Sequence, residues 1–106
     1  MLEENLYTVL SKDEGQARIR LNPRCPIYAA HFPGYPITPG VTLVQMALEL
    51  MGLKLLGAKE IKFIVPVQPS PEGTVLRYEW TRIADRADVH VFLDGDILCA
   101  KMTLSV

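Results

Sequence analysis

The chain has 106 residues, of which 49% are hydrophobic and 22% charged, a composition typical of a globular protein rather than a disordered one. The formal net charge of -1 argues against a nucleic-acid-binding protein, which would usually carry a basic face. The length predicts a single domain, residues 1–106, with one core.

The first predicted elements are two strands. Residues 6–10 form a short strand, and the alternation of Ala17, Ile19 and Leu21 with polar residues predicts a half-buried strand over residues 15–21. Residues 22–40 hold five of the eight prolines. We therefore expect this long connection to be shaped by proline rather than by secondary structure, and loops of this kind are usually functional.

The pattern of residues 41–56 predicts one helix. Its apolar residues cover most of the circumference, which indicates burial on nearly every side, and leave a narrow polar stripe of Thr42, Gln45 and Glu49. Gly57 is predicted to cap the end of the helix. The helix is too short and too polar to span a bilayer, and residues 1–5 do not look like a signal peptide, so we expect a cytoplasmic protein.

Four more strands are predicted, over residues 59–67, 74–83, 88–93 and 97–106, with Asp94 and Gly95 as a two-residue hairpin turn. This order of elements predicts an α+β domain in which one hydrophobic helix packs on a mainly antiparallel sheet. Cys25 and Cys99 have no histidine or cysteine at metal-ligand spacing. We therefore predict two reduced thiols and no metal site.

The most informative segment is residues 31–42, His-Phe-Pro-Gly-Tyr-Pro-Ile-Thr-Pro-Gly-Val-Thr. Its prolines fix φ and its glycines permit unusual φ, so the path of the loop is strongly constrained. Pro39 and Gly40 begin the helix, where the missing N–H of a proline has no cost. A histidine beside such a helix end, with its unpaired N–H groups and partial positive charge, has the parts of a site for acyl groups.

This segment resembles the histidine motif of the bacterial 3-hydroxyacyl-acyl-carrier-protein dehydratases, which belong to the hotdog-fold superfamily. The matching positions are His31, Phe32, Pro33, Gly34, Pro36, Pro39, Gly40 and Val41. The resemblance implies a hotdog fold, in which an antiparallel sheet wraps around one long hydrophobic helix. It also implies a homodimer with active sites at the interface, and a substrate that is an acyl carrier protein or coenzyme A thioester. No cofactor is implied, because the phosphopantetheine arm belongs to the substrate.

Two residues of the motif have candidate catalytic roles. His31 is the candidate base that removes the α-proton of a 3-hydroxyacyl thioester, and its alternative role is a structural bond to the loop backbone. By resemblance, Gly40 is where the thioester carbonyl is polarised by backbone N–H groups, and the missing side chain lets the ligand approach. A conformational requirement of the Pro-Gly turn is compatible with that role.

Gln45 occupies the position at which the family carries a catalytic Glu or Asp. Its simplest role is structural, as a buried amide that satisfies backbone groups. An amide can hydrogen-bond but cannot deliver a proton, so three possibilities stay open for the chemistry. His31 alone takes the α-proton and returns it to the leaving hydroxyl, which Gln45 orients. Alternatively, Glu49, one helical turn after Gln45, replaces the missing acid. The simpler interpretation of Glu49 is a solvated or ion-paired carboxylate on the surface. In the third possibility, the site binds acyl chains without turning them over.

The predicted substrate-binding residues are Phe32, Pro33, Gly34, Tyr35, Pro39, Val41 and Glu49. The aromatic members suit an acyl tunnel or simple packing equally well.

We therefore expect a dehydratase-like lyase of fatty-acid or polyketide-type synthesis. The alternatives are a non-catalytic acyl-binding relative, a heterodimer partner of a complete dehydratase, and a hotdog thioesterase. The His-Phe-Pro-Gly run argues against the thioesterase, since hotdog thioesterases generally rely on a carboxylate and lack this loop.

Overall fold

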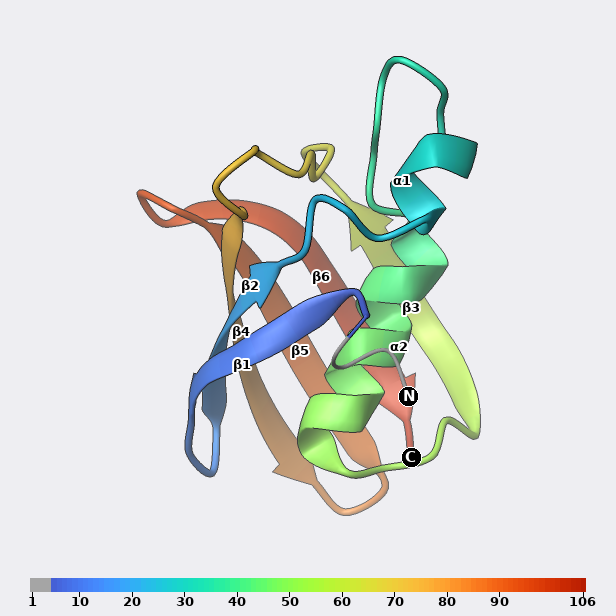
Figure 1. Cartoon of the computed structure of the whole chain (residues 1–106). Coiled ribbons are helices and arrows are strands. Elements are labelled where there is room, and N and C mark those ends of the chain that lie inside the picture. The colour runs from blue at the N-terminus through green and yellow to red at the C-terminus, as the bar shows by residue number, and fades with distance from the viewer. Residues whose placement is uncertain (1–4) are drawn as a thin grey trace.

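The structure is a computed structural model that describes residues 5–106 (Figure 1). Its elements in chain order are β1 (Tyr7–Lys12), β2 (Gln16–Leu21), α1 (Ile27–Ala30), α2 (Gly40–Met51), β3 (Gly57–Phe63), β4 (Val75–Ile83), β5 (Arg86–Leu93) and β6 (Ile97–Ser105). The residues that argue against a signal peptide lie mostly outside this range. Within residues 5–106, no helix is long and apolar enough to cross a membrane.

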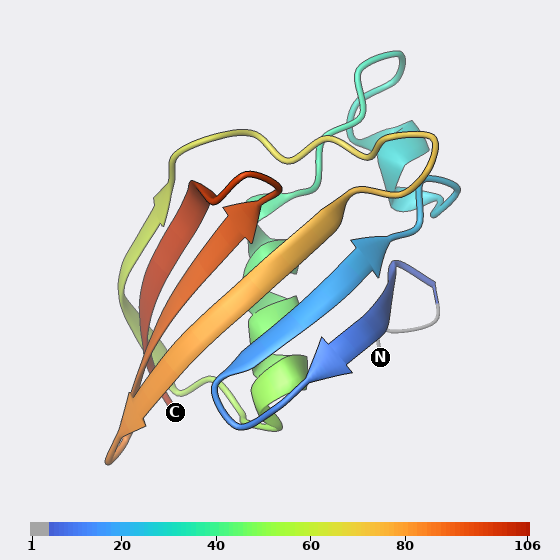
Figure 2. The same cartoon turned by 90° about the vertical axis from the view of Figure 1, so that its left-hand side faces the viewer.

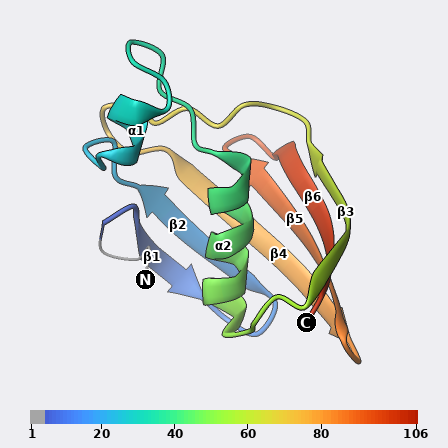
Figure 3. The ribbon, with the colours of Figure 1, turned by 90° about the vertical axis from the view of Figure 1, so that its right-hand side faces the viewer.

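The strands form a six-stranded antiparallel sheet in the order β1-β2-β4-β5-β6-β3. Figure 2 shows the outer face of this curved sheet, and Figure 3 shows α2 lying across the inner face, between β1 and β3. The prediction of one helix packed on an antiparallel sheet is confirmed. β3 is an outer strand of the sheet, and the segment that follows it lines a cavity together with the start of α2.

The core forms between α2 and the inner face of the sheet. Leu43, Met46 and Leu50 of α2 are buried, and each side chain of this size stabilises the fold by roughly 1.5–3 kcal/mol. The hydroxyl of Tyr78 in β4 donates a hydrogen bond of 3.0 Å to the carbonyl of Leu43. Burial raises the pKa of Tyr78 well above its ordinary value. The hydrogen bond itself joins the first turn of α2 to the sheet.

The prediction that the helix ends at Leu56 is wrong by more than one helical turn. The helix ends at Met51, and Gly52 caps it in the left-handed region with a φ of 68°. The N–H of Leu53 then bonds to the carbonyl of Leu48 at 3.0 Å, which turns the chain away. Gly57, the predicted cap, instead begins β3.

Three smaller predictions also need correction. The connection 22–40 contains a short helix, α1, which starts after Pro26 because the φ of -56° at this proline already suits a helical turn. The strand predicted to run to residue 67 ends at Phe63, where pairing with β6 stops at Ala100. The hairpin between β5 and β6 has a three-residue loop, because Leu93 pairs with Ile97.

Candidate active site

The motif loop begins with a tight turn at residues 32–35. The N–H of Phe32 bonds to the carbonyl of Tyr35 at 3.1 Å, and the N–H of Tyr35 bonds to the carbonyl of Phe32 at 2.9 Å. Pro33 and Gly34 fill the two central positions, and the φ of 76° at Gly34 identifies a type II turn. The turn leaves Phe32 and Tyr35 exposed, at 50% and 57%.

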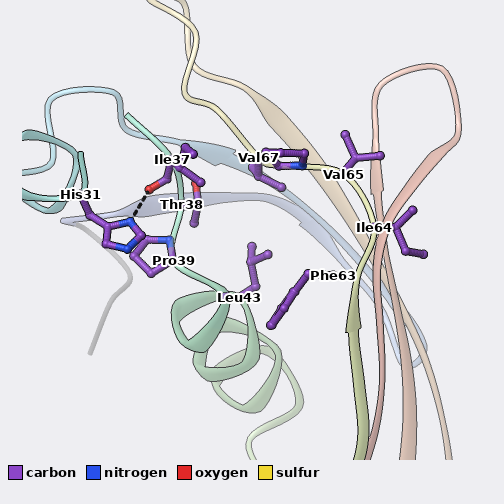
Figure 4. A pocket seen from close by; sticks show the side chains of 11 residues that line it. His31, Ile37, Thr38, Pro39, Leu43, Phe63, Ile64, Val65 and Val67 are labelled. Atoms are coloured by element: carbon purple, nitrogen blue, oxygen red, sulfur yellow. Dashed lines mark hydrogen bonds between the residues drawn. The ribbon is translucent and has the colours of Figure 1, made fainter. Parts of the chain in front are cut away.

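His31 lies between this turn and α1. Its N–H bonds to the carbonyl of Ile27 at 3.0 Å, and its carbonyl accepts from the N–H of Ile37 at 2.9 Å. The ring stacks on Phe32 with centroids 4.0 Å apart, and Nδ1 lies 3.4 Å from the carbonyl oxygen of Ile37 (Figure 4). A proton on Nδ1 would point at that carbonyl, which leaves the lone pair on Nε2 for a proton transfer.

The segment before α2 is held by buried hydrogen bonds. The N–H of Thr38 bonds to the carbonyl of Val67 at 2.7 Å, and its hydroxyl shares a hydrogen bond of 2.9 Å with the hydroxyl of Tyr28. Burial raises the pKa of Tyr28, although the bond to Thr38 acts in the opposite direction. These contacts fix the approach to Pro39, which has no side-chain oxygen to bond the first N–H groups of α2.

A cavity of about 360 Å³ opens between these segments. His31 and residues 37–40 form one wall, residues 63–67 form the opposite wall, and Leu43 lies between them (Figure 4). Of the described residues that line the cavity, His31 alone is ionisable. A single imidazole thus faces an apolar space that also contains the start of a helix.

The cavity brings together His31, Pro39 and Gly40 from the predicted site. Ile37 and Thr38, which lie between them, also line it. The predicted residues Phe32, Pro33, Gly34 and Tyr35 do not, because they form the exposed turn described above.

The predicted residues of α2 that follow Gly40, namely Val41, Gln45 and Glu49, do not line the cavity. Val41 is 74% exposed, and Gln45, one turn later on the same side, is exposed as well, so the alternative of a buried amide at Gln45 is wrong. Glu49 is half-buried and accepts a hydrogen bond from Tyr7. The supposed polar stripe is therefore divided, because Thr42 is buried while Gln45 faces outward.

The opposite wall of the cavity was not predicted as part of the site. Phe63, Val65 and Val67 belong to a stretch whose β-branched and aromatic residues resemble a strand. Pro66 was the available signal, because a proline cannot donate a ladder hydrogen bond and so marks irregular backbone.

Comparisons with known proteins place these observations in a family. The ApeI-like family model, described as ApeI dehydratase, matches residues 8–100. The 3-hydroxyacyl-acyl-carrier-protein dehydratase FabZ of Zymomonas mobilis is 34% identical in an alignment 82 residues long, which covers 63% of this chain and 50% of FabZ. The chain thus spans about half the length of this curated relative.

Solved structures share the fold. The dehydratase heterocomplex ApeI:P from Xenorhabdus doucetiae gives a TM-score of 0.68 at 21% identity, over 97% of both chains. The dehydratase domain of MlnD from Bacillus amyloliquefaciens gives a TM-score of 0.65 at 13% identity, over 99% of this chain and 43% of that one. A hypothetical thioesterase with coenzyme A from Streptococcus pneumoniae gives a TM-score of 0.58 at 14% identity, over 93% of this chain and 82% of that one.

The solved structures confirm the predicted hotdog fold. The family model and FabZ confirm the predicted relationship to the dehydratases. The match of the family model over most of the chain shows that the protein belongs to the ApeI-like dehydratase family.

Proposed function

We propose that the chain dehydrates 3-hydroxyacyl thioesters to enoyl thioesters in the cavity between His31 and Gly40. The observation that carries this proposal is the placement of one ionisable side chain, His31, in an apolar cavity that also contains the start of α2. The contact of Nδ1 with the carbonyl of Ile37 supports His31 as a base, because it leaves Nε2 available to the substrate.

The proposed reaction removes water across two carbon atoms. The N–H groups at the start of α2 polarise the thioester carbonyl and stabilise the charge that develops on its oxygen. Nε2 of His31 takes the α-proton, the C–O bond at the β-carbon breaks, and a carbon–carbon double bond forms. The imidazolium then returns the proton to the departing hydroxide, so that water leaves and the base is restored.

Gln45 enters this proposal only through a second subunit. Within one chain it lies on the exposed side of α2 and outside the cavity, so it has no contact with a substrate bound there. The exposed outer strand β3 offers an edge for a second copy, which would continue the sheet and bring another α2 to the interface. In such a homodimer, Gln45 would orient the leaving hydroxyl.

The substrate is proposed to be carried by an acyl carrier protein or by coenzyme A, in fatty-acid or polyketide-type synthesis. The 34% identical relative is an acyl-carrier-protein dehydratase, which favours the carrier protein. A thioesterase is less well supported, because no carboxylate is present among the described residues that line the cavity.

A second candidate function is that of a heterodimer half or an acyl-binding subunit. Gln45 favours this second candidate, because this chain has an exposed amide at the position where the dehydratases that it resembles carry a catalytic acid. One structure with the same fold is a dehydratase heterocomplex, which gives this candidate a precedent in the fold.

The decisive experiment compares wild type, His31→Ala and His90→Ala in a dehydration assay with short and medium 3-hydroxyacyl-carrier-protein substrates. His90 is the matched control, because it is the other histidine of the chain and is exposed on β5. We expect His31→Ala to lower kcat by about 10²-fold or more, while His90→Ala retains turnover.

Failure of the enzyme proposal has a clear signature. A folded wild type that binds the acyl chain but shows no turnover would favour the second candidate. Co-expression with a complete dehydratase would then distinguish a heterodimer half, which co-purifies with it, from a subunit that only binds acyl chains.

A further inference from the structure

The side chain of Phe63 lies against Gly40. A Cβ atom placed on Gly40 would lie only 2.4 Å, 2.6 Å and 3.0 Å from three carbons of the Phe63 ring. Figure 4 shows the ring extending from the end of β3 toward the first turn of α2, across the cavity from His31. The ring therefore occupies the place that a side chain at position 40 would need.

This contact changes the role that is expected for Gly40. The absence of a side chain at Gly40 was expected to admit a ligand to the helix N-terminus, but an aromatic ring fills that space here. A thioester carbonyl that approaches the first N–H groups of α2 from this side meets the edge of Phe63. Under the proposed function, substrate binding consequently requires the ring to move.

The ring is able to move without disturbing the core. Phe63 is 52% exposed, and the atoms nearest Gly40 are Cζ, Cε1 and Cε2, the outer end of the ring. The backbone beyond it is anchored, because the N–H groups of Ile64 and Val65 bond to the carbonyl of Cys99 at 2.8 Å and 3.2 Å. Rotation about the side-chain torsions of Phe63 is thus an easier route to opening than movement of the strand.

We propose that Phe63 is the residue that controls access of the acyl thioester to Gly40, an inference that rests on the proposed function. In the closed position, its ring covers the start of α2 and reduces the open space between the two walls of the cavity. In the open position, the ring leaves Gly40 and lines the entry for the thioester. The size of side chain 63 then sets how often the site is ready to bind.

The proposal predicts an effect on association. If the open form is a minor population of about a tenth, removal of the ring raises the association rate about tenfold, because the apparent rate scales with the competent fraction. Phe63→Leu should fall between wild type and Phe63→Ala. Ile61→Ala is the matched control, since Ile61 is an exposed apolar residue two positions earlier on β3 and does not line the cavity.

The test measures association of a stable probe, the crotonyl-pantetheine amide in which nitrogen replaces the thioester sulfur. The probe is immobilised, and surface plasmon resonance gives association rates for wild type, Phe63→Ala, Phe63→Leu and Ile61→Ala. Circular dichroism confirms that each variant is folded, and Phe63→Leu carries the test if Phe63→Ala does not fold. We expect faster association for both Phe63 variants and an unchanged rate for Ile61→Ala.

The outcomes separate this proposal from the proposed function. Probe binding by wild type with no acceleration in either Phe63 variant, or with the same acceleration in Ile61→Ala, overturns the gate and leaves the acyl site intact. Lack of binding by every folded variant overturns the acyl site and the gate together. Binding by the Phe63 variants alone supports both.

Discussion

The hydroxyl of Tyr7 donates a hydrogen bond of 2.9 Å to Oε1 of Glu49, and so joins β1 to the last turns of α2. Tyr7 is 2% exposed and Glu49 is half-buried, so the bond lies at the margin of the core. The carboxylate of Glu49 does not line the cavity that contains His31. This geometry favours a structural role for Glu49 over that of the missing acid.

Changes at this pair should affect stability more than chemistry. We expect Tyr7→Phe to lower the free energy of unfolding by about 1 kcal/mol, the usual net value of a hydrogen bond, in a urea titration. Glu49→Gln should retain turnover in the dehydration assay. A loss of about 10²-fold in kcat for Glu49→Gln, with unchanged stability, would instead identify Glu49 as a catalytic acid.

Gln45 provides a test of the assembled site. If a second subunit brings this position to the cavity, Gln45→Glu supplies a proton donor, and we expect kcat to rise about tenfold or more. Gln45→Ala, the matched variant, should lower kcat because it cannot orient the hydroxyl. Equal kcat values for wild type and both variants would show that position 45 does not reach the substrate.

The sequence predicts the regular elements better than the shape of the site. Alternation and helical periodicity are local, so the strand around Ile19 and the helix at Leu43 could be located. The end of the helix could not, because apolar residues continue past Gly52 and a second glycine, Gly57, follows them.

The same limit applies to the cavity. His31 and Gly40 belong to one local motif, and the structure places both on the cavity wall. The contact of Phe63 with Gly40 arises from a chain reversal between α2 and β3, which no local pattern specifies. The division of the polar stripe also escaped prediction, because helical spacing places Thr42 and Gln45 on one face, and only tertiary packing buries the first and exposes the second.

The close approach of Phe63 to Gly40 predicts a coupling between substitutions at the two positions. Gly40→Ala places a methyl group against the Phe63 ring, so we expect it to destabilise the wild-type chain more than the Phe63→Ala chain. A double-mutant cycle from urea unfolding should give a coupling of about 1 kcal/mol, which is within the usual range for residues in contact. Additive effects would show that the ring does not restrict position 40.

The two cysteines should differ in reactivity. Cys99 is fully buried, its thiol donates to the carbonyl of Val91 at 3.3 Å, and burial raises its pKa to about 11. Since the thiolate is the reactive form, Cys99 should resist a disulfide reagent at neutral pH, while the half-buried Cys25 reacts first. Cys25→Ser should remove the fast phase. Fast labelling that persists in Cys25→Ser would show that the sheet around Cys99 opens readily.

Asp88 on β5 predicts a dependence of stability on pH. Hydrogen bonds from Arg86 and then from Thr103 lower the pKa of this carboxyl group below its ordinary value. A lowered pKa in the folded state means that the contribution is present above the ordinary value and is lost as the pH falls through the folded one. We therefore expect the unfolding free energy of wild type to fall more steeply than that of Asp88→Asn below about pH 4. High salt should reduce the difference, because the pair is on the surface. Parallel pH profiles for the two proteins would contradict this account.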